Sequence, residues 1–233
     1  MSEATNATPW RILFVSMPIL IAGGLAVAVG LFFIVTWIGR PATGALVELR
    51  FTSRCGEAWA PVLMARANAV GLGEPSVRQE QGETILRARM PGLDDDLTAI
   101  PALLTRPAVF EIYVAEAVDA PPAGAPIATN ADVTEVYFQI DATGHPMAYL
   151  RLSELAQTRL NDADPPALLY VLDGAVVDAF HSARQFDEDH VELRPRLQTT
   201  KEEVRVATDW SIALGSGPAP CAAEGLVVVR AAE

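Results

Sequence analysis

The sequence predicts an α+β protein in which a single N-terminal transmembrane helix precedes a domain built of two βαββαβ units. Three observations predict this fold class. Residues 12–38 are strongly apolar and contain no charged side chain. After them, short alternating runs typical of strands are interspersed with helical patterns. The order strand, helix, strand, strand, helix, strand occurs at 45–118 and again at 136–230.

The first element is the apolar segment Ile12–Ile38, which follows a short polar tail at 1–11. As a helix, its 27 residues reach about 40 Å, against a hydrocarbon core of about 30 Å. A cleavable signal has an apolar region of about 7–15 residues and a small-residue cleavage site, so we expect an uncleaved anchor. Aromatic and basic residues at both ends are typical of membrane-interface anchors, namely Trp10, Arg11, Trp37 and Arg40.

Small and kinking residues lie inside this segment. Pro18 can kink the helix, and Gly23-Gly24 offers a point of bending or of close helix packing. Two interpretations remain open. The glycines either mark a contact with another membrane helix or only reflect how common small residues are in such helices.

Charge bears on the orientation of the chain. Arg11 lies before the span, while Arg40, Arg50 and Arg54 follow it, so local basic residues do not favour an N-terminus in the cytoplasm. The short tail and the long acidic domain do favour it. The first 40 residues hold one acid and two bases, which leaves 28 acids and 15 bases, a balance of −13, for the rest. Such a domain is repelled by nucleic acid. We therefore expect a bacterial inner-membrane protein with a cytoplasmic N-terminus and a periplasmic domain.

The first unit, 45–118, begins after Pro41. A helical pattern places Trp59, Leu63, Arg66 and Ala67 on one face. Pro91-Gly92 ends the second of two adjoining strands. The expected strands are 45–51, 76–81, 83–90 and 108–118, and the expected helices are 55–71 and 94–106.

A Pro- and Ala-rich loop at 119–135 separates this unit from the second, 136–233. Asp173-Gly174 between two apolar runs is a strong hairpin signal. The helix at 199–214 begins with Thr and has Glu three residues on, the pattern of a capping box. The expected elements are strand 136–141, helix 152–160, hairpin 167–180, helix 199–214 and strand 225–230. Each unit thus has the ferredoxin-like order, and we expect an antiparallel sheet with helices on one face.

The two cysteines suggest a disulfide. Cys55 follows the first predicted strand and Cys221 precedes the last. If those strands are antiparallel neighbours, the end of one lies beside the start of the other. An even cysteine count also suits an oxidising compartment. The alternative is two buried thiols.

No motif indicates catalysis or a bound metal. His181 and His190 are nine residues apart with acids between them, which favours a solvated loop over a metal site. His145, before Pro146, is interpreted as a turn residue. The acidic run 94–96 suits a helix N-terminus better than calcium. The carboxylates of Glu111, Asp141 and Asp178 can pair, but any acidic domain offers such pairs. We assign no catalytic residue, metal or cofactor.

Five segments, in order, resemble a known family. Their sequences are ARANAVGLGEPSVRQEQGETILRARMPGL (65–93), PAVFEIYVAE (107–116), VYFQIDATG (136–144), ALLYVLDGAVVDAF (167–180) and TTKEEVRVATDWSIALGSGPAPC (199–221). Together with the preceding span they resemble the first transmembrane helix and first periplasmic domain of the SecD protein-export membrane protein family.

The sequence also departs from the SecD pattern. The family's acidic-Gly-Gly motif after the first span is not intact, since this chain has LRFTSRCG. The 233 residues contain no second apolar run of about 18, so the family's remaining transmembrane helices are not expected and proton-coupled transport is not implied.

The resemblance implies a domain that binds other proteins and is not an enzyme. We expect an accessory or structural subunit of a larger integral membrane complex in the lipid bilayer, respiratory or photosynthetic for example. A protein-export or periplasmic folding accessory that binds exported polypeptides is the first alternative. A periplasmic hydrolase is a remote second alternative.

Overall fold

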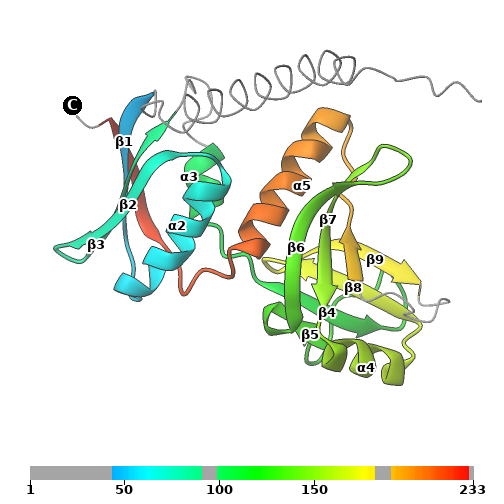
Figure 1. The fold of residues 1–233 in the computed structure, drawn as a ribbon. Helices are drawn as coiled ribbons and strands as arrows, with labels where there is room; N and C mark the ends of the chain where they lie inside the picture. Colours follow the sequence, from blue (N-terminus) through cyan, green and yellow to red (C-terminus); the bar gives the residue numbers. More distant parts are fainter. Residues whose placement is uncertain (1–43, 91–98, 182–189, 231–233) are drawn as a thin grey trace, which may run out of the picture. The chain divides into compact units, whose positions relative to one another are not determined.

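The computed structural model describes residues 44–90, 99–181 and 190–230. Gly44–Glu233 forms one compact unit. No helix within the described ranges is both long and apolar enough to cross a membrane. The predicted span Ile12–Ile38 lies outside these ranges, so it stays a prediction. The described domain is mixed α+β with three antiparallel sheets, as Figure 1 shows.

The first sheet has the order β11-β1-β3-β2, and neighbouring strands are antiparallel. In Figure 1 the red strand β11 lies beside the blue strand β1. The elements in this part of the domain are β1 (Ala45–Thr52), a 3-10 turn (Gly56–Ala58), α2 (Trp59–Ala69), β2 (Gly73–Glu80), β3 (Glu83–Met90), α3 (Ala99–Leu104) and β11 (Glu224–Arg230).

Alternation along β1 gives this sheet its core. Val47, Leu49 and Phe51 are buried on one face and belong to the same apolar cluster as Trp59 and Leu63 of α2. The rings of Phe51 and Trp59 meet edge to face, with centroids 5.1 Å apart. The predicted periodicity of α2 is confirmed, because its apolar face is the one that is buried.

The chain between α3 and β11 builds two further sheets. The second sheet has the order β5-β4-β8-β9, and the third has the order β10-β7-β6. Their strands are β4 (Phe110–Ala115), β5 (Ala128–Thr129), β6 (Val133–Ile140), β7 (Pro146–Leu152), β8 (Ala167–Leu172), β9 (Ala175–His181) and β10 (His190–Leu193). Two helices, α4 (Glu154–Ala163) and α5 (Thr200–Gly215), and a 3-10 turn (Asn130–Asp132) accompany them.

One core joins the second and third sheets to α5. Phe110 and Ile112 of β4 share a buried cluster with Leu150 of β7 and with Trp210 and Leu214 of α5. Helix α5 packs along β6 and β7. The two sheets therefore bury each other's apolar faces, and α5 supports the third sheet.

The sheets do not follow the two predicted consecutive units. Strand β4, expected to complete the first unit, pairs with β5 and β8 instead. Strand β11, expected to close the second unit, pairs with β1. The local pattern of a strand sets which face is apolar, but not which distant strand satisfies its backbone. Here Val228 of β11 packs against the first core, whereas Phe110 and Ile112 fit the core shared with α5.

Candidate polypeptide-binding surface

Strand β6 forms an edge of the third sheet. It hydrogen-bonds to β7 on one side, and no other strand of the described ranges pairs with its second side. Such an edge presents a row of backbone N–H and C=O groups that can pair with another chain. We define the β6 surface as this edge together with Tyr137, Phe138 and Ile140.

The β6 surface is apolar on both faces of its strand. Tyr137 is 39% exposed, Phe138 37% and Ile140 54%. Nearer the start of β6, Val136 turns inward, where it packs against the shared core and faces Gly215 of α5. The strand is thus anchored by its first half and presents apolar side chains along its second half.

A row of stacked rings extends from Tyr137 across the third sheet. The ring centroids of Tyr137 and Tyr149 are 4.6 Å apart, and those of Tyr149 and His190 are 4.2 Å apart. By strand register these three residues lie on the face opposite Leu150 and Val191, which are in the core. Aromatic side chains therefore extend from the β6 edge across one face of the third sheet.

Asp141 fixes the turn at the end of β6. Its Oδ1 accepts hydrogen bonds from Thr143 N, Thr143 Oγ1 and His145 N at 2.8, 2.7 and 2.9 Å. Arg194 Nη1 lies 3.0 Å from Asp141 Oδ2. The Thr143 hydroxyl, followed by the His145 N–H, lowers the pKa of Asp141 to about 2. The carboxylate is therefore ionised, and it orders the turn without any need for a ligand.

These features suit an extended polypeptide. A peptide added as a strand gains backbone hydrogen bonds from the edge, and apolar side chains on alternate faces contact its own. Such recognition depends little on sequence, because the main chain supplies the hydrogen bonds.

Of the three carboxylates considered as a possible cluster, Asp141 and Asp178 both interact with Arg194, whereas Glu111 is separated from Asp178. Glu111 and Asp178 lie on opposite faces of the second sheet, since Glu111 pairs with Val171 and Asp178 with Tyr170. Asp178 is 5% exposed, and burial raises its pKa. Arg196 lies 3.0 Å from its Oδ1. Asp178 thus interacts with two arginines, Arg196 and Arg194.

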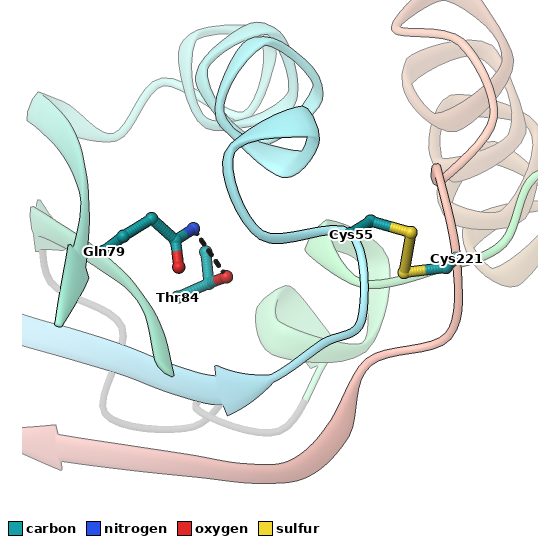
Figure 2. The surroundings of a disulfide bond; sticks show 4 residues. All are labelled: Cys55, Gln79, Thr84 and Cys221. Carbon is teal, nitrogen blue, oxygen red and sulfur yellow. Dashed lines mark hydrogen bonds between the residues drawn. A yellow bond between two sulfur atoms is a disulfide. The ribbon is translucent and has the colours of Figure 1, made fainter. Parts of the chain in front are cut away.

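The two cysteines are joined. Their Cα atoms lie 6.1 Å apart and a disulfide links them, as Figure 2 shows. The disulfide was predicted on the condition that the first and last strands are antiparallel neighbours. The structure meets this condition, because β1 pairs antiparallel with β11 and Thr52 pairs with Glu224. Figure 2 also draws Gln79, whose Nε2 donates a hydrogen bond to Thr84 Oγ1 at 2.8 Å.

The remaining predicted positions divide into two groups. His145 has Glu203 at 3.9 Å, and His190 has Glu192 at 3.7 Å, so both have acidic neighbours that the sequence did not reveal. His181 is the last residue of β9, where it pairs with Ala167. The remaining positions lie outside the described residues: Trp10, Arg11, Pro18, Gly23, Gly24, Trp37, Arg40 and the acids at 94–96.

The β6 surface itself was missed in the sequence. Residues 136–140 are apolar in both phases of the strand, which normally indicates burial on both faces. Strand β7 was also missed, so the edge position of β6 could not be inferred. The signal that was present is the run VYFQI directly before an Asp-x-x-Gly turn, which is typical of a hairpin arm.

Comparison with known proteins shows the fold. No family model matches the chain, and no curated protein matches it. A structure described as SecDF in the super-membrane-facing form aligns with 91% of this chain at 17% identity and a TM-score of 0.63. This chain spans about a third, 35%, of that one. A second structure, of SecDF described as a membrane component that enhances protein export, aligns over 80% of this chain and 100% of its own at 20% identity and a TM-score of 0.61. Over most of its length, this chain therefore has the fold of the matching part of SecDF.

Proposed function

We propose that this protein is a non-enzymatic, membrane-anchored accessory of protein export. Its domain holds extended polypeptides in the periplasm, and Ile12–Ile38 anchors it with the N-terminus in the cytoplasm. The observation that carries the proposal is the exposed apolar β6 surface on a domain with the fold of SecDF. The similarity favours the export alternative over a subunit of a respiratory or photosynthetic complex.

Binding a polypeptide to the β6 surface is energetically favourable. Exposed aromatic and aliphatic side chains gain about 25 cal/mol for each Å² that a ligand removes from water. An edge with unpaired amides adds backbone hydrogen bonds. The acidic domain also keeps the protein soluble and repels nucleic acid, which leaves polypeptides without strong negative charge as the fitting ligands.

A binding measurement tests this proposal. The full chain in mild detergent is titrated into a fluorescently labelled, permanently unfolded polypeptide of near-neutral charge. We expect Ile140→Lys to weaken binding roughly tenfold, since it puts a charge in place of an aliphatic side chain that the bound polypeptide would cover. Leu155→Lys is the matched control, because Leu155 is 66% exposed on α4, which follows the end of β7 that pairs with Val133 and not the end that pairs with Ile140. Equal affinity of Ile140→Lys and the parent chain, or an equal loss in the control, contradicts the proposal.

Identification of its partners distinguishes an export accessory from a subunit of a respiratory or photosynthetic complex. A tagged full chain is purified in mild detergent and its companions are identified by mass spectrometry. Translocation components or a mixture of exported chains support the export role. Stoichiometric recovery with one unrelated integral complex contradicts it.

A further inference from the structure

Alternate residues of β6 turn their main-chain groups toward the open edge of the third sheet. In an antiparallel pair, the N–H and C=O of one residue bond to the partner strand, and those of the next residue point away from it. The N–H of Asp141, directly after β6, donates to His145 O at 2.9 Å across the hairpin. Because the pairing with β7 is regular here, the groups of Gln139 also bond to β7. Those of Phe138 and Ile140, on either side of it, therefore point to the open edge.

Pro146 supports this assignment independently. It lies opposite Ile140 in β7 and has no N–H to donate. If the main-chain groups of Ile140 were turned toward β7, its C=O would lack a donor. With these groups turned outward instead, the proline costs the β6–β7 pair no hydrogen bond.

The residues with outward main-chain groups also carry exposed apolar side chains. Phe138 is 37% exposed and Ile140 is 54% exposed. Side chains alternate along a strand, so both lie on the same face as Val136, which packs against the shared core. Their partners in β7, Ala148 and Pro146, are buried. Hydrogen-bonding groups and apolar surface are thus offered by the same two residues of the edge.

We propose that the β6 surface binds extended, proline-poor segments whose main chain pairs with the N–H and C=O groups of Phe138 and Ile140. This inference rests on the function proposed above and specifies its ligand. The bound segment must offer free amides at alternate positions and apolar side chains on the face of Phe138 and Ile140. A strand added in either direction uses the same groups of β6. Proline-rich and helical segments are excluded, because their amides are absent or already bonded.

A pair of peptides separates the hydrogen bonds from apolar contact. The probe is a soluble fluorescent peptide in which valine and threonine alternate, titrated with the full chain in mild detergent. In the matched peptide two adjacent central amides are N-methylated, which removes a donor from each edge of the peptide and adds apolar surface. We expect this change to raise the dissociation constant roughly tenfold.

The outcomes distinguish this inference from the proposed function. Equal or tighter binding of the methylated peptide overturns the inference, because apolar contact alone then explains the affinity. Binding of the unfolded polypeptide without binding of the unmodified peptide also overturns it and leaves the proposed function in place. If neither ligand binds, both fail.

Proline variants test the assignment within β6. Ile140→Pro removes an N–H that points to the open edge, whereas Gln139→Pro removes one that bonds to β7. We therefore expect Gln139→Pro to lower the melting temperature more than Ile140→Pro does. Ile140→Ala is the control for binding, since it shortens the side chain and keeps the N–H. We expect the peptide to bind Ile140→Pro several-fold more weakly than Ile140→Ala. Equal destabilisation by the two prolines, or equal binding to Ile140→Pro and Ile140→Ala, overturns the proposal.

Discussion

Asp141 holds one end of the β6 surface through a set of short contacts within its own turn. Its Oδ1 accepts three hydrogen bonds, and Arg194 lies against its other oxygen. Because these contacts favour the ionised form, the pKa falls from 3.8 to about 2. A carboxyl whose pKa is lower in the folded state stabilises the fold above its unfolded pKa. That stabilisation is lost as the pH falls through the folded value.

Asp141→Asn should therefore lower the melting temperature at pH 7, and the difference from the parent protein should vanish as the pH approaches 2. Thermal unfolding followed by circular dichroism across this range measures the effect. Asp162→Asn, at an exposed position of α4, is the control. A constant difference between Asp141→Asn and the parent protein at all pH values would show that the charge of Asp141 is not the cause.

Among the secondary-structure elements, helix α5 supports β6 and β7 by packing against them. Its N-cap residue is Thr199, whose side chain accepts a hydrogen bond from Glu202 N at 3.3 Å. Glu202 and Glu203 in the first turn complement the helix dipole. The capping residue was predicted from the sequence, and the structure confirms it.

Removing this cap should cost about 1 kcal/mol of the free energy of unfolding in Thr199→Ala. Urea denaturation measures the loss, and hydrogen exchange should show faster opening of the first turn of α5. Thr208→Ala is the control, since its hydroxyl only donates to Val204 O within the exposed helix surface. A loss in Thr199→Ala no larger than in the control would contradict the assigned cap.

The disulfide acts at the scale of the whole molecule, because it joins the beginning and the end of the described domain. Cys55 and Cys221 are separated by 166 residues, so the bond restricts nearly the entire chain when it is unfolded. Ring closure of this size contributes roughly 3–5 kcal/mol in the loop-entropy view. It holds the turn after β1 to the segment that leads into β11.

Reduction of this bond, or Cys55→Ser with Cys221→Ser, should lower the free energy of unfolding by roughly 3–5 kcal/mol. Non-reducing mass spectrometry of tryptic peptides should first show the Cys55–Cys221 link. Alkylation of both thiols in the native protein would contradict it. The sheets should persist after reduction, since β1 and β11 are also joined by their own antiparallel backbone pairing.

The helical spacing of α2 predicts that Arg66 is buried, but it does not predict which groups Arg66 contacts. Its helical spacing predicted a place on the buried face, and it is 0% exposed. Its partners are backbone carbonyls far along the chain, since Arg66 Nη1 donates to Arg106 O at 2.6 Å and Nη2 to Gly217 O at 2.9 Å. Burial lowers its pKa to about 10, so it remains charged at pH 7. It thereby holds together the chain leaving the first sheet and the chain returning to it.

Local sequence alone determined many elements of this domain, although not β7. The strand at 83–90, the Asp173-Gly174 turn and the cap of α5 all depend on neighbouring residues, and their positions are confirmed. Only the tertiary structure decided that β11 joins β1, that β4 joins β8, and that β6 is left at an edge. A strand's own residues set its apolar face. Its partner depends on which distant face fits that surface and completes its backbone hydrogen bonds.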